Sequence, residues 1–70
     1  MKFRNLVKVF REQQGLSREQ LARKADVTVY TVWRFENESD NMTPKAHIGS
    51  CFAVANALGK NVTDVFFMEK

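Results

Sequence analysis

Side chains that could do chemistry are few and scattered in this chain of 70 residues. His47 and the single cysteine, Cys51, are four residues apart, so they share one face of a helix, but two ligands do not complete a zinc site. No pattern places a base for the Cys51 thiol, and the three glycines do not form a phosphate-binding loop. We therefore expect no enzyme activity, no metal, no cofactor and no small-molecule substrate.

Lysines and arginines indicate a different chemistry, the binding of a polyanion. Residues 1–24 hold seven Lys and Arg against two Glu, a local charge of +5, whereas the whole chain carries +3. Residues 25–45 carry a net charge of −2. A basic N-terminal part favours nucleic acid as a partner, although the same charges also keep a small domain soluble.

Length and composition limit what the chain can build. Seventy residues, 44% hydrophobic and 27% charged, are typical of one small globular domain, and we expect it to span residues 1–70 without a separate effector or dimerisation domain. The longest uncharged stretch, Ala46 to Gly59, is shorter than the roughly 18–20 apolar residues of a membrane helix. One cysteine cannot form an internal disulfide, and residues 1–24 lack a secretory signal. We expect a cytoplasmic protein with no membrane partner.

The first predicted helix rests on apolar residues at helical spacing. These are Phe3, Leu6, Val7 and Phe10. Gly15 ends this helix, because glycine adopts the left-handed cap conformation most easily. No segment alternates between apolar and polar residues in the way that a hairpin requires, so we predict no strands.

Two short helices follow. Ser17 and Gln20 form a capping-box pattern, which starts a helix from about Arg18 to Ala25. Thr28 is the expected N-cap of the next helix, through about Phe35. The turn of three or four residues between them gives the anatomy of a helix-turn-helix, whose second helix lies in the DNA major groove.

The C-terminal part predicts two more helices. After a polar loop from Glu38 to Met42, Thr43 and Pro44 start a helix that Gly59 ends. Its apolar stripe is Ile48, Cys51, Phe52, Ala55 and Leu58, which makes Cys51 a buried small hydrophobe. Asn61 and Asp64 start a last short helix that carries Val65 and Phe66. We therefore predict an all-α fold, a compact five-helix bundle.

The sequence resembles the phage repressor and Cro type of helix-turn-helix domain (Cro/C1-type, XRE-like) over about residues 3–67. The sharpest motif is Gly-Leu-Ser-x-x-x-Leu-Ala at residues 15–22, and further matches are residues 6–11, 27–36, 58–59 and 65–66. The resemblance implies a lambda-repressor-like bundle with the helix-turn-helix at about residues 18–36. It also implies a transcription regulator, such as a repressor, that reads double-stranded operator DNA with the helix at about residues 28–36.

The resemblance also assigns roles to residues. It implies a structural ion pair between Arg11, late in the first helix, and Glu36, at the end of the recognition helix. Arg18, the first residue of the second helix, is expected to meet a DNA phosphate, with Thr31 as a further phosphate contact. The base-reading positions fall on Val29, Tyr30 and Arg34, with Trp33 beside them.

The recognition helix departs from the family pattern. It presents Val29, Tyr30 and Trp33 where polar readers of base edges are usual, and the loop after it carries Glu38 and Asp40, which would repel a DNA backbone. Three interpretations fit. These apolar residues contact DNA, or they form the surface for a protein partner, or Val29 and Trp33, which are four residues apart, both partly cover the core and leave only Tyr30 and Arg34 outward. A partner surface is expected in an antirepressor, a modulator that joins a separate repressor, or an antitoxin.

Self-association would have to use this same domain. Helix-turn-helix domains commonly bind two half-sites as two-fold dimers, so a homodimer is one expected assembly. The predicted contact is the segment Val65 to Met68. Because Phe66 and Phe67 are adjacent, a helix cannot turn both toward one core, and one of them is available for an interface.

Overall fold

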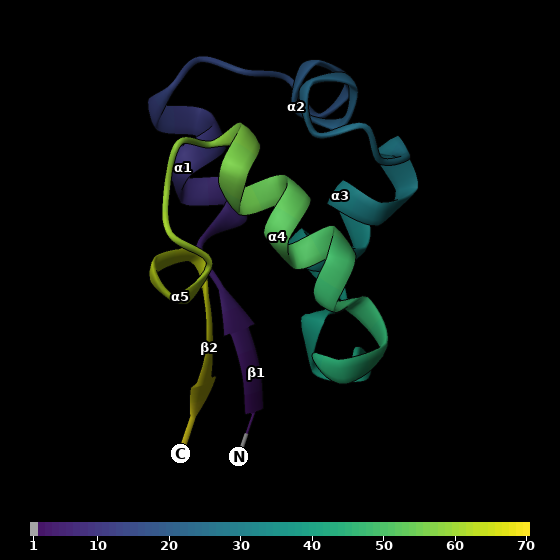
Figure 1. Cartoon of the computed structure of the whole chain (residues 1–70), viewed down its shortest axis with the longest axis vertical. Helices are drawn as coiled ribbons and strands as arrows, with labels where there is room; N and C mark the ends of the chain where they lie inside the picture. Colours follow the sequence, from purple (N-terminus) through teal and green to yellow (C-terminus); the bar gives the residue numbers. More distant parts are fainter. Residues whose placement is uncertain (1) are drawn as a thin grey trace.

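The fold is a bundle of five short helices with a small β-ribbon at one end (Figure 1). The computed structural model describes residues 2–70. The α-helices are α1 (Val7–Gln13), α2 (Arg18–Ala25), α3 (Val29–Asn37), α4 (Ile48–Ala57) and α5 (Val62–Val65). Two 3-10 turns, Ser39–Asn41 and Lys45–His47, connect α3 to α4, and the strands are β1 (Lys2–Asn5) and β2 (Phe66–Glu69). The predicted five-helix bundle is confirmed, and the strands are a minor addition to it.

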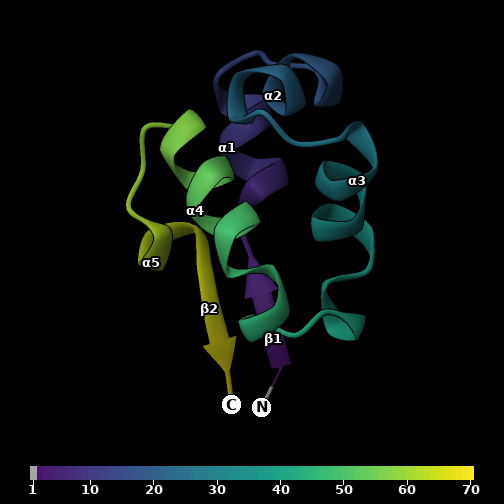
Figure 2. The ribbon, with the colours of Figure 1, turned by 45° about the vertical axis from the view of Figure 1, so that its right-hand side comes forward.

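The β-ribbon joins the two ends of the described chain. Strands β1 and β2 pair antiparallel, with Phe3 opposite Met68 and Asn5 opposite Phe66. In Figures 1 and 2 the ribbon lies at the end of the molecule away from α2. The prediction that Phe3 and Phe66 belong to helices was therefore wrong. Each strand has four residues, too few to show an alternating pattern, and it is the pairing across the whole chain that makes them strands.

Side-chain caps fix both helices of the helix-turn-helix. Ser17 Oγ accepts a hydrogen bond from the Gln20 amide at 3.0 Å, and Gln20 Oε1 accepts one from the Ser17 amide at 2.8 Å. Thr28 Oγ1 accepts from the Thr31 amide at 3.1 Å. Between the helices, Asp26 adopts a left-handed conformation with φ of 57°, which ends α2 and lets α3 begin after a turn of three residues.

The core lies between α1, α2, α3 and α4, and the β-ribbon closes one end of it. Its largest fully buried side chains are Val7, Leu21, Val32, Phe35, Val54 and Val65. Phe66 closes the lower end of this core, because its ring packs edge-on against Phe35 at 4.9 Å and stacks on Phe3 at 5.8 Å. Within residues 2–70, none of the helices has both the length and the apolar character that a membrane crossing requires.

The expected apolar stripe of α4 needs a correction. Cys51, Val54, Ala55 and Leu58 are buried, but Ile48 is 58% exposed and Phe52 is 55% exposed. The buried residues recur at i, i+3, i+4 and i+7 from Cys51, so Phe52 lies on the flank of this stripe. Ile48 lies in the first turn, because α4 starts there and not at Pro44. Two large apolar side chains are thus left on the surface.

Candidate nucleic-acid interface

A single carboxylate ties the first three helices together. Glu36 lies in the last turn of α3, and its side chain is only 1% exposed. Arg11 of α1 donates from Nε to Glu36 Oε2 at 2.7 Å and from Nη2 to Oε1 at 3.2 Å. Arg18 of α2 donates from Nε to Oε1 at 3.0 Å. The two guanidinium groups therefore hold α3 against both α1 and α2.

The Arg11 guanidinium is itself tightly bound. Its hydrogen bond with Glu36 raises the pKa of Arg11 above its ordinary value, although partial burial acts in the opposite direction. Nη1 of Arg11 also donates to the carbonyl oxygen of Leu16 at 2.9 Å, just before the N-terminus of α2. Arg11 thus holds both the residue before α2, where the helix-turn-helix begins, and the last turn of α3, where it ends.

Arg18 combines an internal contact with exposure. Its side chain is 36% exposed although Nε is bonded to Glu36. The family resemblance assigns this position to a phosphate contact, and the link to Glu36 was not apparent from the sequence. The hydrogen bond with Glu36 holds the Arg18 side chain in a fixed place at the N-terminus of α2.

The outward face of α3 carries an aromatic pair. Tyr30 is 62% exposed and Trp33 is 37% exposed, and their rings stack with centroids 5.9 Å apart at 15°. Val29 beside them is 40% exposed. The guanidinium carbon of Arg34 lies 5.9 Å from the centre of the Tyr30 ring. We call Val29, Tyr30, Trp33 and Arg34 the aromatic face. Trp33 thus belongs to the surface of the helix.

Most other polar groups on α3 are already occupied within the helix. Thr31 Oγ1 lies 2.9 Å from Thr28 Oγ1, which also caps the helix. Asn37 Nδ2 donates to the Trp33 carbonyl oxygen at 3.0 Å. Nε of Arg34 lies 3.4 Å from Glu38 Oε1, is shielded from solvent and forms no hydrogen bond. The aromatic face therefore offers a ligand mostly apolar surface.

The acidic residues that follow α3, Glu38 and Asp40, each lie within ion-pair distance of an arginine. Glu38 faces Arg34, and Asp40 lies 3.6 Å from Arg4 of β1, which also reaches Glu69 at 3.5 Å. The sequence predicted that Glu38 and Asp40 would repel a DNA backbone. Their cationic neighbours weaken that repulsion, and the contact between Arg4 and Asp40 arises from the β-ribbon, which sequence reasoning missed.

His47 and Cys51 take no part in this face. His47 is half-buried, with its ring edge-on to Phe35 at 6.5 Å. Cys51 is 4% exposed, and burial raises the pKa of its thiol to about 11. A thiol with that pKa is protonated at neutral pH and is a poor nucleophile. Residues 2–70 contain no group of three or more His, Cys, Asp or Glu that could hold a metal ion.

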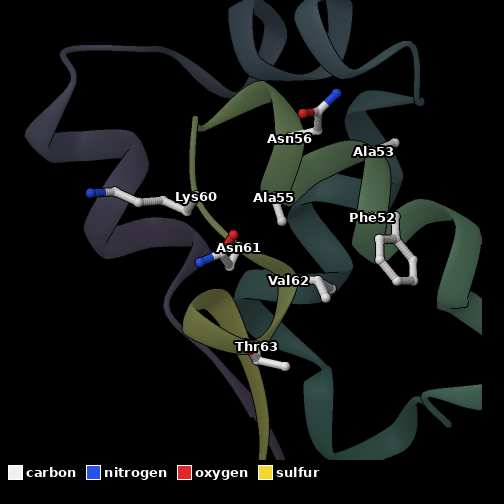
Figure 3. A pocket seen from close by; sticks show the side chains of 8 residues that line it. All are labelled: Phe52, Ala53, Ala55, Asn56, Lys60, Asn61, Val62 and Thr63. Atoms are coloured by element: carbon white, nitrogen blue, oxygen red, sulfur yellow. The ribbon is translucent and has the colours of Figure 1, made fainter.

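Two hollows of the surface are lined by residues of α4 and of the C-terminal segments, not by the aromatic face. An open groove of about 640 Å³ lies between α4 and α5. Figure 3 shows the side chains that line it, with the Phe52 ring at its edge and Val62 near its centre. An apolar hollow of about 270 Å³ lies on the other side of Phe52, against Ile48, Phe66 and Met68. Phe52 therefore projects between two depressions.

We predict that Glu36 is essential to the stability of the domain. Replacing it with alanine leaves Arg11, whose side chain is 11% exposed, without its counter-charge, so Glu36→Ala should lower the free energy of unfolding in urea by about 3–5 kcal/mol. Glu38→Ala is the matched control, since Glu38 lies two residues further along in a half-exposed pair, and should cost less than about 1 kcal/mol. Equal losses in the two variants would contradict this role.

The comparisons with known proteins agree with this geometry. A family model described as helix-turn-helix matches residues 7–65, which includes all five helices. The comparisons with curated proteins and with solved structures found no match. The chain belongs to the helix-turn-helix family of the phage repressor and Cro type and is a DNA-binding regulator.

Proposed function

We propose that this protein is a sequence-specific transcription regulator of the phage repressor and Cro type, and that α3 reads its operator in the major groove. The observation that carries the proposal is the buried Glu36, which holds α3 by its last turn while the first two turns present an exposed face. A recognition helix enters the groove with its N-terminal residues, and these are the residues left uncovered here.

The proposed contacts follow the arrangement of α2 and α3. Val29 and Tyr30, in the first turn of α3, meet base edges, and Arg34 reads one turn further along. Arg18, at the start of α2, and Thr31, at the start of α3, lie near the phosphates on either side of the groove. The positive end of the helix dipole lies at the N-terminus of α2, so it attracts a phosphate together with the charge of Arg18.

We further propose that the operator is bound by two copies of the chain. Ile48, Phe52, Phe67 and Met68 leave exposed apolar surface on α4 and β2. In Figure 2 these two elements lie to one side of α3. Phe52 projects between two depressions, so a two-fold axis can place the ring of each copy in a hollow of the other.

The dimensions of the molecule support this arrangement. The two shorter extents are 19 and 18 Å. Two copies joined through α4 and β2 separate their recognition helices by roughly twice that width, which is close to the ~34–36 Å between half-sites one helical turn apart.

The aromatic face favours a second candidate function. A stacked Tyr30 and Trp33 with Arg34 at the edge is also the composition of a protein-binding hot spot. In that case the domain acts on another protein, as an antirepressor, a modulator of a separate repressor, or an antitoxin. Weak and unselective binding of DNA by the folded protein would favour this candidate.

Selective DNA binding tests the proposed function directly. Titrated at two salt concentrations, the protein should select duplexes from a random-sequence pool, and the affinity should fall steeply with salt because phosphate contacts release counterions. Arg34→Ala should weaken binding by about 1–3 kcal/mol and relax one base preference. Lys70→Ala, at the end of the molecule away from α2, is the control and should change little. If the protein selects no sequence at either salt concentration, the proposal is overturned.

The proposed dimer can be tested separately. Sedimentation should show a dimer on operator DNA for the native chain, and Phe52→Glu should leave a folded monomer, because two carboxylates would be forced into an apolar contact. Val9→Glu, on the 46% exposed Val9 of α1, is the matched control and should leave the dimer intact. Dimers of equal stability in both variants would exclude this face.

A further inference from the structure

The aromatic face is poorly suited to reading bases by hydrogen bonds. The Thr28 and Thr31 hydroxyls contact each other, and the Asn37 amide is used by the Trp33 carbonyl. Arg34 lies over the Tyr30 ring with its Nε shielded beside Glu38. The polar groups left to face a ligand are therefore few, namely the Tyr30 hydroxyl, the Trp33 indole N–H and the tip of Arg34.

Most of the aromatic face is exposed apolar surface. Val29, Tyr30 and Trp33 are each at least 37% exposed, and they follow one another along the first two turns of α3. The stack of Tyr30 on Trp33 fixes both rings on the surface of the helix. The result is an apolar strip on the part of a recognition helix that approaches the bases.

The major groove offers one prominent apolar group, the C5-methyl of thymine. The same methyl group is present in 5-methylcytosine. Contact with it buries carbon against carbon and needs no donor or acceptor from the protein. The strip formed by Val29, Tyr30 and Trp33 thus matches the one base feature that does not require hydrogen bonds.

Charge favours DNA over a protein partner as the occupant of this strip. Among the acids nearest to it in sequence, Glu36 is bonded by Arg11 and Arg18, and Glu38 and Asp40 lie beside Arg34 and Arg4. Asp26 is the one of these four that forms no ion pair within residues 2–70. On α2, which packs against α3, Arg23 and Lys24 are exposed and form no ion pair within residues 2–70. An apolar strip on α3 together with exposed, unpaired cations on α2 suits a ligand with methyl groups between two rows of phosphates.

We propose that Val29, Tyr30 and Trp33 form a binding site for the C5-methyl groups of 5-methylpyrimidines, so that the protein selects its operator largely by the positions of thymine methyls. This inference rests on the proposed function, because it requires α3 to enter the major groove. It assigns specificity to apolar contacts, with Arg34 in a lesser role.

The test uses the full chain and a duplex selected from a random-sequence pool. Each thymine of the half-site is replaced in turn by deoxyuracil, which keeps the base pair and removes only the methyl group. At one or more positions the affinity should fall about fourfold, the factor that corresponds to one buried methyl group. At the same positions, cytosine should bind more weakly than 5-methylcytosine by a similar factor.

Variants link the effect to the strip. In Trp33→Ala or Val29→Ala the preference for thymine over deoxyuracil should shrink toward unity at the affected position. Val9→Ala, at a similarly exposed valine on α1, should retain the full preference. Circular dichroism checks that each variant is folded.

Two different failures can be told apart. Tight, selective binding that is equal for thymine and deoxyuracil at every position would overturn the methyl site and leave the proposed function standing. A preference for thymine that survives in both strip variants would also overturn the site. A folded protein that selects no duplex would overturn the proposed function, and the methyl site with it.

Discussion

A buried carboxylate must be matched by positive charge and hydrogen bonds, and in this fold that constraint falls on Glu36. Its side chain is 1% exposed, and Arg11 and Arg18 supply the three hydrogen bonds that it accepts. Each arginine comes from a different helix, so the charge requirement of one residue fixes the mutual placement of α1, α2 and α3. The orientation of the recognition helix is set at its last turn, and its first turns remain free to meet a ligand.

The character of the aromatic face follows from how α3 satisfies its own polar groups. Thr28 and Thr31 are used to start the helix, and Asn37 is used near its end. What remains outward is the stack of Tyr30 on Trp33. Arg34 and Arg4 offset the negative charge of Glu38 and Asp40. The acidic loop therefore repels a DNA backbone less strongly from the aromatic face.

Local signals in the sequence predicted the helices well, because the information lies within a few residues. The capping box of Ser17 and the cap of Thr28 have the geometry that their spacing predicts. The β-ribbon could not be predicted, because strands of four residues depend on pairing across the whole chain. For the same reason the exposure of Ile48 and Phe52 and the bond between Arg18 and Glu36 were missed. Each depends on which elements pack together, which periodicity along one helix does not specify.

The most direct test of the account follows the emission of Trp33, the single tryptophan of the chain, while a selected duplex is added. If α3 lies in the major groove, the emission of this exposed ring should be quenched or shifted. The change should follow the same binding curve as the anisotropy of labelled DNA. A duplex that binds fully by anisotropy and leaves the Trp33 emission unchanged would contradict the claim that this face of α3 contacts DNA.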